Sequence, residues 1–444
     1  MNIIKSLKNF SMTAALIATM LMLSGCGAQE TGLETGTENI TLENLENTLE
    51  TTSGETAKQP ETEEEFHAAM VERSLYSLGN TKRLKEKFQK ARDGEEVTIA
   101  YIGGSITEGI GGGNDGCYAK LSADMFAEKF GTEKFGTEKF GNVNYINAGL
   151  SGTPSNLGVL RLQRDVLDNS PDIIFVEFAV NDGQDKIAKE SYESLVKTAL
   201  EAESEPAVIL LFNVIESGYT AQEHMKQIGT FYDLPMISAA DALTPEFEEG
   251  RMTWQDYSGD QSHPNKFGHG LLCEFIEYLY DKADAADAPA AYEVKPGEVF
   301  GSPYANARLL TPLYGEDCVD CVGGNVAVKD TGAFAMGNGS SSGFTGCWQY
   351  GGGDEPMKIH VSGSSFFVIY KRDNKEERGA FDVYLNGEKL TTVNTNQKDG
   401  WGEAFSQQII KFQTSKEMDF EIRPAEGSED KTIEILGFAA AGKE

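Results

Sequence analysis

The sequence is poor in histidine, cysteine and basic residues. Among 444 residues there are only 5 histidines and 6 cysteines, and 38 Lys and Arg face 70 Asp and Glu, which gives a formal net charge of -32. A surface this acidic repels polyanions, so nucleic acid and anionic lipid headgroups are not expected partners. A neutral polymer or a small neutral ester meets no such barrier.

The sequence also lacks an apolar run long enough to span a bilayer comfortably. The run near its start, MTAALIATMLML, follows Lys5 and Lys8 and is typical of a signal peptide over residues 1–25. The LSGC that follows resembles the lipobox of bacterial lipoproteins, which implies cleavage before Cys26 and a lipid on its sulfur. We therefore expect an extracytoplasmic protein anchored to the membrane only through Cys26. An ordinary signal peptide with an incidental cysteine is the alternative.

Residues 26–65 have hardly an aromatic and one basic residue, Lys58. A segment of Thr, Glu, Asn and Gly cannot bury enough apolar surface to offset its ordering entropy, so we predict a disordered acidic tether. With Cys26 lipidated, an odd number of cysteines remains. Cys318 and Cys321 form a C-x-x-C without a second pair or nearby histidines, so no metal is expected.

Residues 66–290 alternate between apolar strand-like runs and amphipathic helical runs. The expected strands are EVTIAYIGG, VNYINAGL, PDIIFVEFAV, PAVILLFNVI and PMISAADAL, and the helices between and after them include residues 118–130 and FGHGLLCEFIEYLYDKADAA. This alternation predicts an α/β domain with a parallel sheet covered on both faces. Ligands bind beyond the carboxyl ends of such strands, where Ser105, Gly152 and Asn181 lie.

Residues 291–444 lose the helical periodicity, and Gly, Ser and Asn separate short alternating runs. PMKIHVSG, SSFFVIYKR, GAFDVYLNG, KLTTVNT, FSQQIIKF, DFEIRPA and TIEILGFA are each expected to be strands, with a hairpin at LNGEK. We predict an all-β, jelly-roll-like sandwich. Trp348, Tyr350 and Trp401 are candidates for a sugar-stacking platform, against the alternative that each packs in the core.

Ser105 follows the apolar run and two glycines of VTIAYIGGSITEG, and it is a candidate nucleophile only if a base lies near it. His263 lies in SGDQSHPN, and Asp260, three residues earlier, is placed to orient its ring. The alternative for this loop is an Asx-type turn with a surface histidine. Trp254 and Tyr257 precede the loop and are candidates for lining a sugar or acyl site, with packing as the alternative.

Four blocks in chain order, GGSIT, NAGLSGTPS, VEFAVND and DQSHPN, resemble those of the SGNH (GDSL-type) esterases and acylhydrolases over roughly residues 73–284. The resemblance implies a flavodoxin-like, three-layer αβα domain and a serine mechanism without a cofactor or metal. Two positions depart from the family pattern. Gly104 stands where the family has the aspartate of G-D-S, and Ala179 stands for the first glycine of G-x-N-D.

The resemblance implies roles residue by residue. Ser105 would be the nucleophile, His263 the general base and acid, and Asp260 the residue that orients His263. The backbone N–H groups of Ser105 and Gly152 and the side chain of Asn181 would form the oxyanion hole. We read Asp182 as a residue that caps its loop, and His269 as packing.

These features predict a surface-anchored serine esterase that removes short acyl groups, O-acetyl above all, from a glycan. A lipase or thioesterase-like acylhydrolase and a peptidoglycan O-acetylesterase are alternatives within the same chemistry. A non-catalytic glycan-binding lipoprotein is the alternative of another class. Its signature would be the loss of Ser105, His263 or Asn181, and all three are present.

Overall fold

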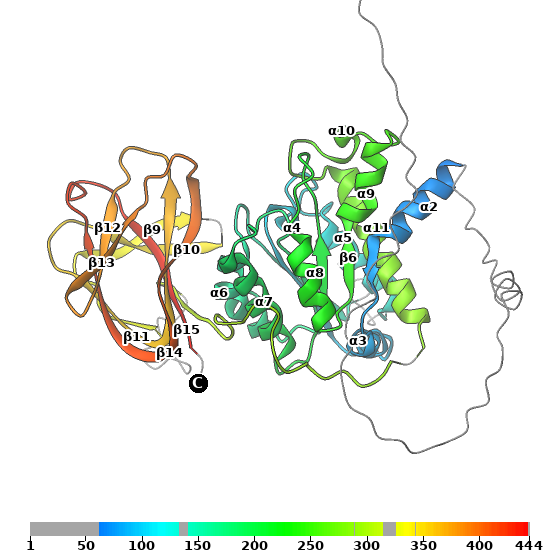
Figure 1. Cartoon of the computed structure of the whole chain (residues 1–444), viewed down its shortest axis with the longest axis horizontal. Helices are drawn as coiled ribbons and strands as arrows, with labels where there is room; N and C mark the ends of the chain where they lie inside the picture. The colour runs from blue at the N-terminus through cyan, green and yellow to red at the C-terminus, as the bar shows by residue number, and fades with distance from the viewer. Residues whose placement is uncertain (1–61, 133–140, 288, 314–325, 342, 443–444) are drawn as a thin grey trace, which may run out of the picture. The chain divides into compact units, whose positions relative to one another are not determined.

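The computed structural model describes residues 62–132, 141–287, 289–313, 326–341 and 343–442 (Figure 1). The expected signal peptide with Cys26, the tether up to residue 61, and Cys318 and Cys321 lie outside these residues, so the expectations for them stay predictions. The tether was expected to reach residue 65. Instead, helix α2 (Glu63–Ser74) begins within that range, and a capping box of Thr62 and Glu65 starts it.

A six-stranded sheet forms the centre of the first region. Its strands are β1 (Leu75–Ser77), β2 (Val97–Gly103), β3 (Val143–Gly149), β4 (Ile173–Glu177), β5 (Ala207–Phe212) and β6 (Met236–Ser238), in the order β1-β6-β5-β4-β2-β3. All pairs are parallel except that of β1 with β6. The five parallel strands have the flavodoxin-like order. The topological switch point, where such sheets bind ligands, lies between β2 and β4.

Helices cover both faces of this sheet, which confirms the predicted α/β domain. One core contains the inward faces of α6 (Ser155–Asp165), α7 (Lys186–Leu200) and α8 (Gln222–Phe231). The other contains residues of α2, α3 (Lys82–Arg92), α5 (Tyr118–Phe130), α9 (Ala239–Glu248) and α11 (Lys266–Ala285). The short helices α4 (Ser105–Glu108) and α10 (Trp254–Tyr257) lie at the carboxyl edge.

One expected strand of this region is wrong in its second half. PMISAADAL was read as a strand, but β6 ends at Ser238 and α9 begins at Ala239. The Ser238 hydroxyl accepts a hydrogen bond from the backbone N–H of Asp241, which caps the helix. No helix among the described residues is long and apolar enough to cross a membrane.

The second region is all antiparallel β-structure. Its strands are β7 (Arg308–Leu310), β8 (Val326–Asp330), β9 (Phe334–Ser341), β10 (Phe344–Tyr350), β11 (Met357–Asp373), β12 (Ala380–Leu385), β13 (Glu388–Asn394), β14 (Trp401–Pro424) and β15 (Glu434–Ala441). Four expected strands are in fact two: PMKIHVSG and SSFFVIYKR are both β11, and FSQQIIKF and DFEIRPA are both β14. The hairpin at LNGEK is confirmed, with Asn386 and Gly387 both at positive φ.

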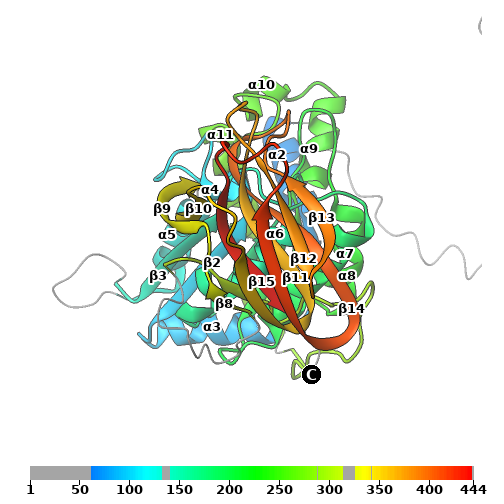
Figure 2. The same cartoon turned by 90° about the vertical axis from the view of Figure 1, so that its left-hand side faces the viewer.

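The long strands β11 and β14 join the two halves of this sheet (Figure 2). They pair along their length, with an irregularity at Gly363–Ser365. Before that point β11 pairs with β8, and after it with β15. Side chains from both halves, among them Val361 and Phe366, pack in one core. The expected sandwich is therefore made from one continuous hydrogen-bonded sheet, and its jelly-roll connectivity stays a prediction.

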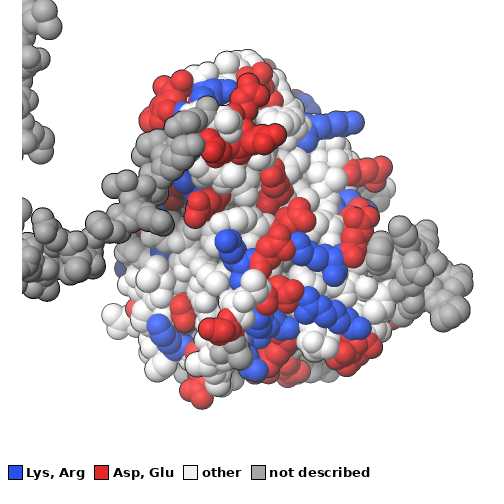
Figure 3. Space-filling view, turned by 90° about the vertical axis from the view of Figure 1, so that its right-hand side faces the viewer, with Lys and Arg blue, Asp and Glu red and all other residues white. Residues whose placement is uncertain are grey.

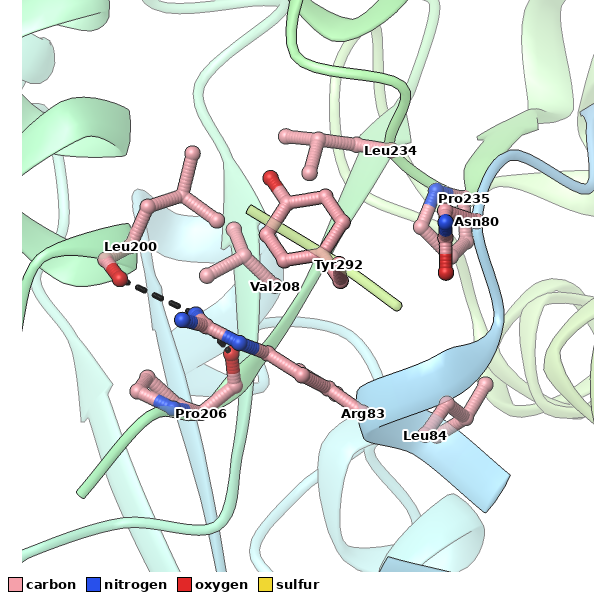
Figure 4. A pocket seen from close by; sticks show the side chains of 10 residues that line it. Asn80, Arg83, Leu84, Leu200, Pro206, Val208, Leu234, Pro235 and Tyr292 are labelled. Carbon is pink, nitrogen blue, oxygen red and sulfur yellow. Dashed lines mark hydrogen bonds between the residues drawn. The ribbon is translucent and has the colours of Figure 1, made fainter. Parts of the chain in front are cut away.

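The segment between α11 and β7 is bound tightly to the α/β region. Glu193 of α7 is buried, and its carboxylate accepts the backbone N–H groups of Val299, Phe300 and Gly301 at 2.6, 2.6 and 2.9 Å. Tyr292 covers Arg83, which donates to the carbonyl groups of Leu200 and Pro206 (Figure 4). The connection is thus a packed strap and not a loose linker.

Acidic and basic side chains are interspersed on the face that lies at the right of Figure 1 (Figure 3). Ion pairs that the structure contains include Arg92–Asp284 at 2.6 Å and Lys129–Glu277 at 3.5 Å. The described residues of this face form no continuous basic stripe.

Candidate active site

Ser105 lies directly beyond the carboxyl end of β2. Gly103 ends the strand, Gly104 is the N-cap residue, and Ser105 is the first residue of the short helix α4. The serine is 9% exposed. A strand-to-helix turn at the switch point therefore holds its hydroxyl at the edge where ligands bind in sheets of this order.

The structure brings Ser105, His263 and Asp260 together. The Oγ atom of Ser105 lies 2.9 Å from Nε2 of His263, and Nδ1 of His263 lies 2.7 Å from Oδ2 of Asp260. With Nδ1–H donating to Asp260, Nε2 is free to accept the serine proton. The other oxygen of Asp260 accepts the backbone N–H groups of Ser262 and His263, so the loop is also the expected Asx-type turn.

These bonds keep Asp260 ionised. Its small burial acts to raise the pKa, but the hydrogen bonds from His263 and from the backbone of Ser262 and His263 outweigh it and lower the pKa to about 2. A permanent carboxylate fixes the tautomer of His263 and stabilises the imidazolium that forms when it takes a proton.

Two side chains hold the loop that contains the histidine. The indole N–H of Trp254 donates to the carbonyl of Asp260 at 2.6 Å, and the Ser258 hydroxyl lies 2.8 and 2.6 Å from the carbonyls of Asp260 and His263. Sequence reasoning missed Ser258. Tyr257 is fully buried in the core, so packing, and not the proposed lining of a substrate site, describes it.

Gly152 and Asn181 lie in the loops that follow β3 and β4, at the same edge of the sheet as Ser105. Gly152 has φ +69°, a conformation that favours glycine. The amide of Asn181 lies flat against Gly104, because a Cβ atom at position 104 would lie 2.2 Å from Oδ1 of Asn181. The glycine that replaces the family aspartate thus gives the asparagine room to approach the nucleophile turn.

Two charged residues that sequence reasoning missed tie these strand ends together. Arg161 of α6 is buried and donates to the carbonyls of Gly103 at 3.0 Å and Ala148 at 2.7 Å. Glu108 of α4 accepts the backbone N–H of Ser151 at 2.8 Å. The position of Arg161 within the apolar face of a helix was a signal in the sequence that could have identified it. The sequence carries no such signal for Glu108.

Two buried acids lie directly behind the site. Asp182 was expected to cap its own loop; instead it accepts the backbone N–H of Ser155, the first residue of α6, at 2.7 Å. Glu177 accepts the Thr107 hydroxyl at 3.2 Å. Burial raises the pKa of each to about 7, against the opposing effect of the hydrogen bonds that they accept.

The other candidates divide between core and surface. His269 is buried; it accepts the backbone N–H of Tyr118 and bonds the carbonyl of Ile110, both at 3.1 Å, which makes it a packing residue. Trp348 and Tyr350 are buried in the β core. Trp401 is 56% exposed, and a Cβ atom at Gly152 would lie 2.9 Å from its Cζ2 atom. It is therefore the one of the three that faces the site.

Two further observations limit what else the site can be. Among the described residues, no group of three or more His, Cys, Asp or Glu side chains is arranged to hold a metal ion. The pocket of Figure 4, lined by Arg83 and Tyr292, lies at the amino ends of β5 and β6. It is at the opposite edge of the sheet from Ser105, so it is not part of this site.

Comparisons with known proteins agree with this geometry. Residues 101–271 match the GDSL-like Lipase/Acylhydrolase family. None of the curated proteins is significantly similar to the chain.

Two solved structures of a two-domain esterase (CEX) active on acetylated mannans are similar over both regions. The first has 25% identity and a TM-score of 0.72 and covers 84% of this chain and 99% of its own. The second, co-crystallised with mannopentaose, has 25% identity and a TM-score of 0.71 and covers 84% of this chain and 98% of its own. Residues 101–271 thus form a domain of the GDSL-like lipase/acylhydrolase family, and the protein is a carboxylic ester hydrolase with the architecture of a two-domain esterase.

Proposed function

We propose that the protein is a serine esterase that removes O-acetyl groups from a glycan through an acyl-enzyme. The observation that carries the proposal is the unbroken chain from Ser105 through His263 to Asp260, with distances of 2.9 and 2.7 Å, at the switch point of the sheet. Three polar side chains in this order are what an alcohol nucleophile needs for activation at neutral pH.

In this mechanism the Oγ atom of Ser105 attacks the ester carbonyl carbon while Nε2 of His263 accepts the hydroxyl proton. The carbonyl oxygen becomes an oxyanion that the backbone N–H groups of Ser105 and Gly152 and the amide of Asn181 hold. The C–O bond to the sugar then breaks, and the sugar oxygen leaves with the proton from His263. Water, deprotonated by His263, attacks the acetyl-serine, and acetate leaves as Ser105 regains its proton.

Two observations support a glycan as the alcohol part. The similar two-domain esterase is active on acetylated mannans. In this chain, the exposed indole of Trp401 lies against Gly152. An indole face stacks well on a sugar ring and is uncharged, so it suits a neutral polymer. Acetylated mannan is therefore the first substrate to test, before acetylated xylan.

The test is acetate release by residues 62–444 from acetylated mannan, acetylated xylan and O-acetylated peptidoglycan, with para-nitrophenyl acetate and a long-chain ester as references. We expect release from a plant glycan and its loss by at least 10³-fold in Ser105→Ala. Hydrolysis of the long-chain ester alone would identify a lipase, and release from peptidoglycan alone would identify a peptidoglycan O-acetylesterase. Binding of a glycan without release from any substrate would contradict the esterase proposal.

We also propose that the protein is held at the outer face of the cytoplasmic membrane by a lipid on Cys26. The order of Lys5 and Lys8, an apolar run and LSGC supports this. Expressed in a bacterium, the full chain should partition into detergent, and Cys26→Ser should move it to the aqueous phase. Equal partition of both forms would contradict the anchor.

A further inference from the structure

Glu177 is a buried acid directly beneath the nucleophile. It is the last residue of β4, it lies opposite Gly103 in the pairing of β4 with β2, and it is 0% exposed. Taking a carboxyl group out of water is costly unless the group is hydrogen-bonded or neutral. Neither the triad nor the oxyanion hole uses it, so its position needs another reason.

The carboxyl group contacts the nucleophile turn directly after Ser105. Its Oε2 atom lies 3.2 Å from the hydroxyl of Thr107, two residues after the serine. The backbone of Glu177 lies opposite Gly103, two residues before the serine, in the pairing of β4 with β2. Glu177 therefore lies beside the start of the turn that carries Ser105 and binds its end.

The contact continues into the core. The Thr107 hydroxyl also bonds the hydroxyl of Tyr118, at 2.8 Å, and Thr107 and Tyr118 are both fully buried. Tyr118 begins α5, so a row of three side chains links β4, α4 and α5. Because the Thr107 hydroxyl can donate to either neighbour and accept from the other, the row stays complete whether Glu177 is ionised or protonated.

We propose that Glu177 is a positioning residue for the ester hydrolysis, which holds Ser105 in line with His263 by binding the nucleophile turn at Thr107. The helix α4 has only four residues and cannot fix its own geometry through an extended ladder of backbone bonds. The buried contact of Thr107 with Glu177 and Tyr118 supplies that rigidity. The inference rests on the proposed function of Ser105.

The test compares kcat and KM for para-nitrophenyl acetate in Thr107→Val, Thr107→Ser and Glu177→Ala with the wild type. Thr107→Val keeps the shape but removes the hydroxyl, whereas Thr107→Ser keeps the hydroxyl. We expect kcat to fall about 30- to 100-fold in Thr107→Val and Glu177→Ala with KM within twofold, because a small misplacement of a reacting atom costs about that much. Thr107→Ser should stay within about fivefold of wild type.

The matched control is Glu193→Ala, which removes an equally buried carboxyl group that anchors the segment at residues 299–301. It should lower the melting temperature and leave kcat unchanged. A second readout is the rate at which diethyl para-nitrophenyl phosphate modifies Ser105, followed by intact mass. That rate should fall in Thr107→Val and Glu177→Ala but not in Glu193→Ala.

Several outcomes would overturn the inference. One is a wild-type kcat in folded Thr107→Val and Glu177→Ala, and another is an equal loss in Glu193→Ala, which would mean general destabilisation. No recovery in Thr107→Ser would also contradict it. A wild-type chain that neither hydrolyses the ester nor is modified at Ser105 would overturn the proposed function, and this inference with it.

Discussion

At the scale of single residues, the site depends on glycines as much as on the residues that react. Gly152 adopts a left-handed conformation, and Gly104 leaves room for the amide of Asn181. The aspartate that the SGNH family has at position 104 would collide with that amide in this chain. Asn181 and Gly104 therefore have to be considered as one unit of the proposed oxyanion hole.

Replacing Gly104 by that aspartate should lower activity. In Gly104→Asp the side chain would displace Asn181, and losing one oxyanion donor costs about 10²-fold in kcat or more. The measurement is kcat for para-nitrophenyl acetate. Gly270→Asp is the control, since a Cβ atom at Gly270 of α11 meets nothing within 4 Å. Full activity in Gly104→Asp would show that Asn181 is not a donor or that it adapts to the new side chain.

The buried acid Glu177 should make stability depend on pH. Its pKa is raised from 4.5 to about 7 in the folded chain, so the folded state binds more protons than the unfolded state between these values. Stability that Glu177 contributes is present below pH 4.5 and is lost as pH rises through 7, by roughly 3 kcal/mol. In Glu177→Gln that loss is absent, so its melting temperature relative to wild type should rise from pH 5 to pH 7.5.

The difference in melting temperature between Glu177→Gln and wild type is the quantity to measure, because His224 and His269 change the stability of both proteins with pH in the opposite direction. Burial lowers their pKa values, so their effect on stability rises with pH over part of the same range. A difference in melting temperature that stays constant from pH 5 to pH 7.5 would show that Glu177 keeps an ordinary pKa.

At the scale of elements, short turns at strand ends carry the chemistry, and buried side chains hold those turns. Arg161 bonds the ends of β2 and β3, Glu108 bonds the loop after β3, and Trp254 bonds the loop with His263. Glu193 does the same for the strap between the two regions. Rigid elements thus place loop residues to within the tolerance that catalysis requires.

The strap offers a stability prediction at this scale. Glu193→Ala leaves the backbone N–H groups of residues 299–301 without their acceptor, and each buried unsatisfied donor costs about 1–3 kcal/mol. We expect a loss of about 3 kcal/mol or more in the free energy of unfolding, measured by urea denaturation. Glu205→Ala, on a side chain 77% exposed, should change little. A stable Glu193→Ala would mean that packing of the strap alone is sufficient.

At the scale of the whole molecule, the two regions share one hydrophobic core. Residues of the α/β region such as Leu150 and Leu157 belong to the same buried cluster as Phe344, Phe367 and Leu436 of the β region. Arg164 of α6 donates to the carbonyl of Gly343 at 3.0 Å and lies over the Phe344 ring. The β region therefore packs against the α/β region and forms a wall beside the loop that contains Gly152.

Contacts with this wall should contribute more to the hydrolysis of polymeric substrates than to that of small esters. Trp401→Ala removes the indole beside Gly152, so we expect kcat/KM for an acetylated glycan to fall about 10-fold or more and that for para-nitrophenyl acetate to change less than threefold. Trp401→Phe should keep part of the activity, and Leu390→Ala, an exposed side chain of β13, should keep all of it. An equal loss of kcat/KM on both substrates would mean that Trp401 only supports the loop that contains Gly152.

The sequence by itself determined most of the elements and identified the candidates for the reacting residues. The alternation over residues 66–290 predicted the parallel sheet, and residues 118–130 are the helix α5 as expected. Spacing along the chain was sufficient to predict the contact between Asp260 and His263, because two residues three positions apart in one loop lie close together in any fold. Strand patterns were less certain: β11 and β14 each look like two short strands, because an irregularity in pairing has no sharp signature in side-chain alternation.

Only the tertiary structure decided which residues stand behind the site. Thr107 and Glu177 are bonded but are 70 positions apart, and Gly152 and Trp401 belong to different regions of the chain. Such contacts depend on strand order and on the packing of one region against the other, which local periodicity does not encode. The sequence could suggest which groups react. It could not show how far each side chain is buried, because burial is a property of the assembled core. Burial there raises the pKa of Glu177 and removes Tyr257 from the surface, whereas Trp401 stays exposed.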